Sequence, residues 1–111
     1  MGRRAEWLAA IYLMAKGYRV LARRFRTKSG EIDLLARKRD VVIAVEVKQR
    51  LTRAAADESI SAESERRISN ALEQFIAARK SLHHCGLRCD VIYFIGARPS
   101  LRRVTHIKDA F

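Results

Sequence analysis

Proline, glycine, cysteine and aromatic residues are all scarce in this sequence. Among 111 residues there are one proline, five glycines and two cysteines, and 7% of the residues are aromatic. Two cysteines do not make the disulfide framework of a small secreted domain. With 49% hydrophobic residues, the composition also excludes a disordered or collagen-like chain. We therefore expect a single folded domain over residues 1–111, with a modest core that needs no disulfide.

Long apolar runs are also absent. The longest run extends from Trp7 to Ala15 and is far shorter than the roughly 20 residues that a transmembrane helix needs. Arg3 and Arg4 precede it, but no small-residue cleavage site follows before Lys16, so a secretory signal is not predicted. We expect a cytoplasmic protein without a membrane partner.

Acidic residues are too few to balance the basic ones. The chain has 12 Asp and Glu against 23 Lys and Arg, which gives a formal net charge of +11. A charge of this size says little about the fold, but it attracts polyanions and speeds their encounter. Nucleic acid is the favoured partner, because phosphate neutralisation supplies most non-specific affinity for DNA. A solvated basic surface on a protein of another function is the alternative that composition leaves open.

The segment 30–50 places charged residues inside an apolar pattern of two strands joined by a polar turn. Strand alternation puts Glu31 and Asp33 on one face, and Glu46 and Lys48 on one face of the next strand. Charges in such surroundings are costly unless they are paired, hydrogen-bonded or bound to a metal. If the hairpin brings these groups together, the carboxylates suit Mg²⁺ or Mn²⁺. The alternative is a charged rim in which Glu46 and Lys48 pair with other side chains.

Apolar periodicity and turn residues predict the remaining architecture. The expected elements are a helix over 3–16, a strand over 18–26, strands over 31–37 and 41–49, a mobile loop over 51–59, a helix from 61 to 84 or 85, a strand over 87–97 and a short edge strand over 104–107. The strand over 41–49 is apolar on both faces and should be central, with the strand over 87–97 parallel to it. Phe111 should fold back onto the core. This order, α-β-β-β-α-β with a mixed sheet flanked by helices, defines an α/β fold.

Three glycines mark expected ends and turns. Gly17 should end the first helix and Gly86 the second, while Gly30 can take a positive φ in the turn that precedes Glu31.

The spacing E-x-D from Glu31 to Asp33, followed by E-V-K from Glu46 to Lys48, resembles the core of the PD-(D/E)XK nuclease superfamily. A longer ordered series, Glu6 on an early helix, KGYRVLARRFR, GEIDLL, VEVKQR, RCDVIYF and HIKDAF, is similar to the YraN-like proteins. These are small bacterial proteins related to archaeal Holliday-junction resolvases. The resemblance covers nearly the whole chain and implies a single-domain restriction-endonuclease-like fold, with metal-dependent hydrolysis of DNA as its chemistry.

The resemblance also implies roles for individual residues. Asp33 and Glu46 would hold Mg²⁺ or Mn²⁺ with the Val47 carbonyl, and Lys48 would orient the attacking water. Glu6 would reach the metal site, although a glutamate in the first turn of a helix also simply favours its positive end. The implied catalytic residues are thus Lys48, Asp33, Glu46 and Glu6, and the implied metal ligands are Asp33, Glu46, Val47 and the supporting Glu31.

Basic residues in three segments are candidates for contact with the DNA backbone. They are Arg23, Arg24, Arg26, Lys28, Arg50, Arg66 and Arg67. Arg66 and Arg67 lie near the start of the second helix, where the helix dipole disfavours cations. Phosphate contact and an ion pair with Glu63 or Glu65 are both open for them.

His83, His84, Cys85 and Cys89 are close in sequence, but no second cysteine pair completes a zinc pattern. We expect Cys89 to be a small core residue and the histidines to cap helix carbonyls.

Three positions depart from the YraN-like pattern. Arg24 stands where many relatives have Asn, Ser64 stands where they often have Lys, and the alanines over 54–56 stand where they favour Gly. These differences concern substrate handling more than metal binding.

The resolvase comparison suggests a homodimer or a DNA-processing partner, and a catalytically silent nucleic-acid-binding or adaptor module is the alternative function. An RNA-binding protein of the translation apparatus would explain the charge but not the E-x-D and E-V-K motifs.

Overall fold

Five strands form one mixed sheet in the computed structural model, which describes residues 3–111; Met1 and Gly2 of the expected domain 1–111 lie outside the described residues. The strands are β1 (Arg19–Arg26), β2 (Glu31–Lys38), β3 (Val41–Arg50), β4 (Gly86–Ile95) and β5 (Val104–Ile107), in that order across the sheet. The helices are α1 (Arg3–Ala15), α2 (Arg53–Glu58) and α3 (Ala62–Ala77), with 3₁₀ turns η1 (Lys80–Leu82) and η2 (Leu101–Arg103). Only β3 and β4 pair in parallel.

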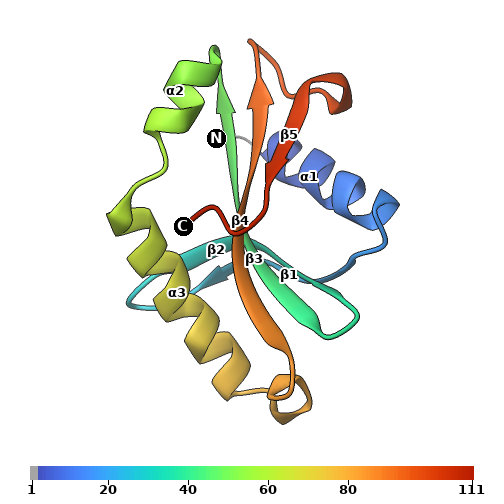
Figure 1. Cartoon of the computed structure of the whole chain (residues 1–111), viewed down its shortest axis with the longest axis vertical. Helices are drawn as coiled ribbons and strands as arrows, with labels where there is room; N and C mark the ends of the chain where they lie inside the picture. The colour runs from blue at the N-terminus through green and yellow to red at the C-terminus, as the bar shows by residue number, and fades with distance from the viewer. Residues whose placement is uncertain (1–2) are drawn as a thin grey trace.

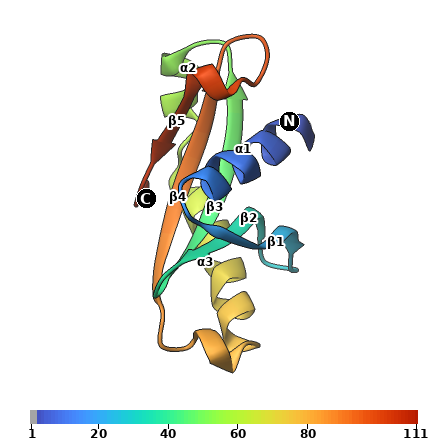
Figure 2. The ribbon, with the colours of Figure 1, turned by 90° about the vertical axis from the view of Figure 1, so that its right-hand side faces the viewer.

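The helices lie on opposite faces of the sheet, with α1 on one face and α2 and α3 on the other (Figures 1 and 2). Ile43, Val45 and Val47 of β3 pack in the cluster that contains α1. Val42 and Ala44, which alternate with them, pack in the cluster that contains α3. Because both faces of β3 are covered, its continuous apolar pattern is explained.

Most of the sequence-based architecture is confirmed. The nuclease-like α/β fold, the helix α1 with Gly17 at a φ of 93° behind it, the arginine-bearing edge strand β1 and the central β3 all occur as expected. The strand β4 lies parallel to β3, β5 forms the other edge, and Phe111 packs against the core. Within residues 3–111, no helix has both the length and the apolar character needed to cross a membrane.

Two predicted segments were wrong. The expected loop over 51–59 contains the helix α2, which begins because the Thr52 side chain accepts the N–H of Ala55 and caps the first turn. The long second helix ends at Ala77. Leu82 belongs to the separate turn η1 and is buried there. It follows Phe75 by seven residues, which is also the spacing of buried residues on one face of a helix, and the predicted helix was therefore too long. Gly86 is consequently the first residue of β4 and does not end a helix.

The role expected of Gly30 was also wrong. Its φ is not positive. Instead, a Cβ atom at this position would overlap the backbone carbonyl of Arg67 in α3. Glycine is therefore needed for the close approach of α3 to the start of β2, which brings Arg67 next to Glu31.

Candidate functional site

The strands β2 and β3 separate at one end and form a fork. Their pairing extends from Lys38 opposite Val41 to Leu34 opposite Val45, and stops there. Asp33, which precedes Leu34 in β2, points its carboxylate toward β3 and accepts the N–H of Val47 through Oδ2 at 2.8 Å. In a strand the N–H and C=O of one residue point to the same side, so the Val47 carbonyl also faces this fork.

Glu46 and Lys48 lie in the same fork, on the face of β3 that carries Val42 and Ala44. The Lys48 Nζ atom donates to Glu46 Oε1 at 3.2 Å, and Lys48 is only 7% exposed. The second oxygen of Glu46, Oε2, is buried and has no hydrogen-bond partner among the residues that the structure describes. A buried carboxylate oxygen without a partner is unfavourable, and a cation would satisfy it.

Asp33 stands in an electrostatically unfavourable position. Its pKa is raised from 3.8 to about 6, first by burial and then by the carboxylates of Glu6, Glu46 and Glu31, although the bond from the Val47 N–H opposes the rise. Perturbed carboxyl groups of this kind are typical of functional sites. Glu6, Glu46 and Glu31 each pair with a cation, whereas Asp33 has no ion pair among residues 3–111, so the unfavourable charge of the fork is that of Asp33.

Glu6 reaches the fork from α1. It is buried, and its Oε1 accepts from Arg24 Nε at 2.6 Å. Glu6 and Arg24 line a hollow together with Asp33 and Glu31. The position of Glu6 in the first turn of α1 favours the helix dipole, but its side chain also belongs to the carboxylate group.

Arg24 has a φ of 53°, a left-handed conformation that is uncommon for an arginine. Asparagine tolerates this conformation better than most residues. An asparagine would therefore fit this backbone with less strain, while the arginine of this chain adds a cation beside Glu6.

Glu31 lies at the exposed end of the fork. It pairs with Arg26 at 3.5 Å and with Arg67 at 3.4 Å. Glu31 also lines a second hollow with Asp33 and Glu46, closed by Ser64, Arg67 and Ile68 of α3. The ion pair of Arg67 is therefore formed with Glu31, and neither Glu63 nor Glu65 provides it.

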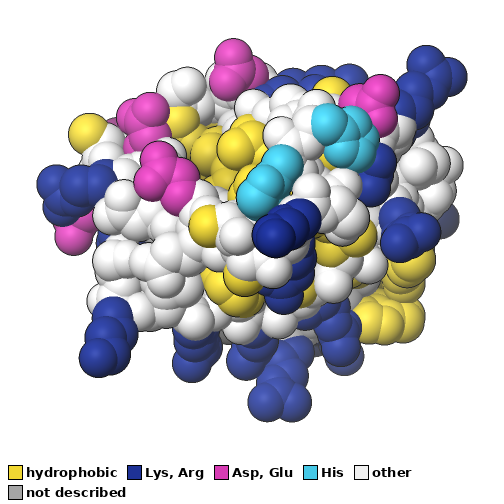
Figure 3. All heavy atoms as spheres, turned by 90° about the horizontal axis from the view of Figure 1, so that it is seen from below, with side chains coloured by type: hydrophobic (Ala, Val, Ile, Leu, Met, Phe, Trp, Pro, Cys, Tyr) yellow, Lys and Arg dark blue, Asp and Glu magenta, His cyan; other side chains and the backbone are white. Residues whose placement is uncertain are grey.

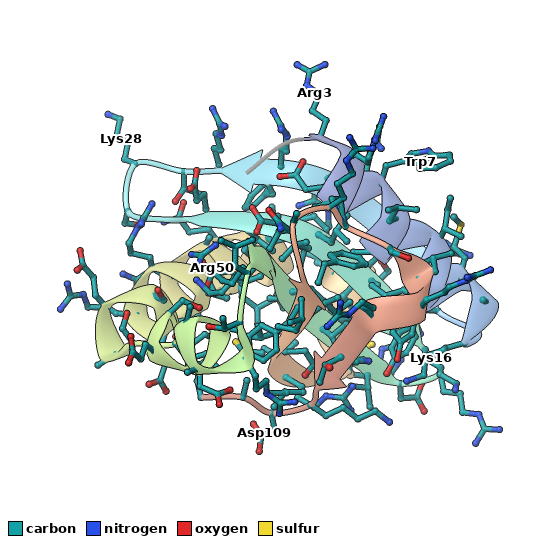
Figure 4. The ribbon with its side chains drawn as sticks, turned by 90° about the horizontal axis from the view of Figure 1, so that it is seen from above. Arg3, Trp7, Lys16, Lys28, Arg50 and Asp109 are labelled. Atoms are coloured by element: carbon teal, nitrogen blue, oxygen red, sulfur yellow. The ribbon has the colours of Figure 1, made fainter. Side chains whose placement is uncertain are left out.

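The remaining basic residues that are candidates for DNA contact lie in two parts of the surface. Arg23, Arg26 and Lys28 are exposed on β1 and the turn after it, and exposed Arg66 shares a hollow with Lys28 and Arg26. Lys and Arg side chains project in a row from this side of the molecule (Figure 3, lower edge). Figure 4 shows Lys28 and Arg3 on that side, whereas Arg50 lies over the middle of the view and donates to the Gln49 carbonyl at 2.9 Å.

The residues of the fork suit a hard divalent cation, but they would supply only some of its ligands. Within residues 3–111, no three His, Cys, Asp or Glu side chains are grouped closely enough to enclose an ion. Asp33 and Glu46 offer two carboxylates, and the unpartnered Glu46 Oε2 and the raised pKa of Asp33 both favour an added positive charge. Mg²⁺ is commonly held by one or two carboxylates, with water and substrate phosphate as its other ligands.

The histidine and cysteine group behaves largely as expected. The Nε2 atom of His83 lies 2.9 Å from the Ile76 carbonyl near the end of α3, which confirms a capping role. His84 lies instead 3.4 Å from Asp40. Cys85 and Cys89 are free thiols that pack against the α3 cluster.

A second charged cluster was missed in the sequence. Asp90 is fully buried in β4 and accepts hydrogen bonds from Arg88, from the Asp109 N–H and from His106, whose Nε2 lies 2.8 Å away. Arg88 also donates to the Tyr18 hydroxyl at 2.9 Å. Burial alone would raise the pKa of Asp90, but the bonds from His106 and Arg88 outweigh it and lower the pKa to about 2. The signal in the sequence was an aspartate within the apolar run over 89–95, since a charge there needs partners.

Comparison with known proteins places this geometry in a family. Residues 5–94 match the family described as "Uncharacterised protein family UPF0102". A UPF0102 protein of Maricaulis maris is 47% identical over 107 residues, which cover 96% of this chain and 84% of the relative. Similar proteins from Mesorhizobium japonicum and from Caulobacter sp. K31 are 44% and 48% identical over 110 residues, or 99% of this chain and 85% and 76% of theirs.

Proposed function

This chain belongs to the uncharacterised protein family UPF0102, the YraN-like group, and on that premise we propose that it is a metal-dependent nuclease that binds DNA and hydrolyses phosphodiester bonds. The observation that carries the proposal is the fork between β2 and β3. There, Asp33, Glu46 and Lys48 converge from two strands, one carboxylate oxygen is buried without a partner among residues 3–111, and the pKa of Asp33 is raised to about 6. Two carboxylates whose charge is incompletely balanced are the donor set expected of a Mg²⁺ or Mn²⁺ site.

The metal ligands would be Asp33, Glu46 and the Val47 carbonyl, with Glu31 and Glu6 contributing negative charge around them. Mg²⁺ or Mn²⁺ bound there would supply Lewis-acid chemistry and offset the repulsion between these carboxylates and a phosphate backbone. Without such an ion, the fork would repel the DNA that the rest of the surface attracts.

Lys48 is the residue best placed to act on the reacting groups. Its Nζ is held by Glu46 in a nearly buried position, where a positive charge interacts more strongly than it would in bulk water. It would orient the attacking water and stabilise the charge that develops on the phosphate. The attacking water loses one proton as its oxygen bonds to phosphorus, one P–O ester bond breaks, and the departing oxygen gains one proton, so that a phosphomonoester and an alcohol are formed.

The basic row would hold the DNA backbone. Arg23, Arg26, Lys28 and Arg66 are exposed along one side, Arg24, Arg26 and Arg67 line the hollows of the fork, and Arg50 ends β3 two residues after Lys48. Contacts of this type position a duplex or a strand without reading its bases. Whether two copies or a DNA-processing partner act together stays an expectation from the resolvase comparison.

The second candidate is a catalytically silent DNA-binding or adaptor module. The direct pairing of Lys48 with Glu46 and the lack of a closed carboxylate cage within residues 3–111 favour it over an enzyme with a fully formed metal site. The two functions differ in turnover but share the affinity for DNA.

Cleavage of labelled DNA separates them. We would incubate the protein with four-way-junction, flap, single-stranded and duplex DNA in Mg²⁺, Mn²⁺ or EDTA, beside Asp33→Asn and Lys48→Ala. We expect metal-dependent cleavage that falls by about 100-fold or more in both variants, while DNA binding persists. The exposed Glu73→Gln on α3 is the matched carboxylate control and should cleave normally. Binding without cleavage in every condition, equal in wild type and variants, would establish the adaptor instead.

A further inference from the structure

Trp7 is a large apolar side chain that the fold leaves exposed. It lies on the outer face of α1, is 55% exposed, and is the only tryptophan of the chain. Its neighbour Glu6 is turned inward to the fork. With 55% of the residue exposed, a large part of the Trp7 ring is accessible to another molecule.

The surroundings of Trp7 are basic and adjoin the proposed site. Arg3 precedes it by four residues and is therefore its neighbour on the helix surface. Arg3, Arg23, Arg24 and Glu6 line one hollow, and Glu6 and Arg24 also line the hollow that contains Asp33. Figure 4 shows Trp7 and Arg3 projecting from α1 on the side that carries Lys28. The ring thus stands at the end of a basic path that leads to the fork.

We propose that Trp7 stacks on an unpaired base of the bound DNA, so that the substrate has single-stranded character beside the bond that is cut. This inference rests on the proposed function and names its substrate class. An aromatic ring flanked by cations that follow the backbone is the combination that binds single strands. Bases inside a duplex already stack on one another, so the ring selects strands whose bases are free.

A second copy of the chain is the other occupant that an exposed apolar side chain could bind. Charge argues against it. Arg3, Arg4 and Arg23 surround this part of the surface in a protein of net charge +11, so two identical faces would repel each other. A polyanion complements the same charges.

The fluorescence of Trp7 tests the inference directly, because no other residue contributes tryptophan emission. The protein in EDTA would be titrated with labelled oligothymidylate, with an abasic oligomer of equal length and with duplex DNA, and bound DNA would be followed by anisotropy. We expect strong quenching by oligothymidylate and little by the abasic oligomer, although both carry the same phosphates. Bound oligothymidylate without quenching would overturn the inference, as would quenching by self-association alone.

Variants give a second, independent readout. Trp7→Ala should weaken binding of oligothymidylate on the order of tenfold and leave duplex binding unchanged, with Trp7→Phe in between. Met14→Ala is the matched control, since Met14 is 53% exposed on the same helix and should have no effect. An equal loss for single strand and duplex would show a structural role and overturn stacking.

The outcome is distinguishable from that of the nuclease proposal. Binding in EDTA requires no turnover, so quenching in a protein that never cleaves would retain the stacking role and reject the nuclease. Cleavage without quenching would retain the nuclease and reject the stacking role. Absence of DNA binding both in EDTA and in Mg²⁺ would reject both.

Discussion

Two aspartates of the same sheet, Asp33 at the fork and Asp90 in β4, have pKa values that are shifted in opposite directions. Asp90 is completely buried, yet donors from Arg88, His106 and the Asp109 N–H surround it, and its pKa falls to about 2. Burial and the carboxylates of Glu6, Glu46 and Glu31 raise the pKa of Asp33 to about 6, because only one backbone N–H opposes them. Burial raises the pKa of both aspartates, so the donors around each carboxylate decide the direction of its shift.

The difference lies in whether the chain supplies the counter-charge itself. Around Asp90 it does, and the network ties β4 to β5 and to the chain end, so the charge of Asp90 is balanced, although the Nδ1 atom of His106 is buried without a hydrogen-bond partner among residues 3–111. Around Asp33 it does not: within residues 3–111 no cation pairs with this carboxylate, although its neighbours Glu6, Glu46 and Glu31 each have one, and its ionisation lowers stability in a way that a bound cation would reverse. Proteins retain residues that lower the stability of the fold mainly at functional sites. Two substitutions and the addition of a metal ion test this contrast.

The largest change in unfolding free energy is expected at the Asp90 cluster. Asp90→Asn removes the charge that Arg88 and His106 are arranged around, and breaking one side of a buried ion pair should cost about 3 kcal/mol of unfolding free energy. Urea unfolding at neutral pH measures it. Asp109→Asn is the control, because only its backbone N–H contacts Asp90 and asparagine tolerates its φ of 52°. A loss at position 90 no larger than that of the control would refute the structural role.

The opposite sign is expected at the fork. Asp33→Asn should raise the unfolding free energy by about 2 kcal/mol above pH 7 in metal-free buffer, because it removes an ionised group that burial and its neighbours disfavour. The amide oxygen can still accept the Val47 N–H. Urea unfolding in EDTA measures the gain, and an unchanged or lower stability would show that the fork is not electrostatically strained.

The pH dependence gives the control for this variant. Because the pKa of Asp33 is 3.8 when unfolded and about 6 when folded, the native state binds more protons between these values, and stability falls as pH rises through them. The gain from Asp33→Asn should therefore vanish below pH 3.8. Asp90 has the reverse dependence, since its contribution is lost as pH falls from 3.8 to about 2.

The smallest effect is that of the ion itself. Mg²⁺ or Mn²⁺ at ten times its dissociation constant should stabilise the wild-type protein by about 1.4 kcal/mol above pH 7. Asp33→Asn should lose most of this stabilisation, whereas the Asp90→Asn protein should keep it. Unfolding curves with and without the ion, at matched ionic strength, measure it. Equal stabilisation of wild type and Asp33→Asn would place the ion elsewhere.

Local patterns in the sequence determined much of this architecture. Alternation along β3 placed Glu46 and Lys48 on one face and predicted that β3 is central, and the spacing of apolar residues predicted α1. These features follow from neighbouring residues, because the periods of strand and helix are local properties of the backbone. The candidate residues Asp33, Glu46 and Lys48 were found for the same reason.

Contacts between distant segments decided the rest. The fork exists because β2 pairs with β3 only from Leu34 onward, and Glu6 meets Arg24 only because α1 packs beside β1. The close approach at Gly30 and the partners of Asp90 likewise join residues that lie far apart in the chain. The sequence alone determined which residues carry charge within the sheet. Only the tertiary structure decided which of those charges are neutralised, because that depends on groups that folding brings together through space.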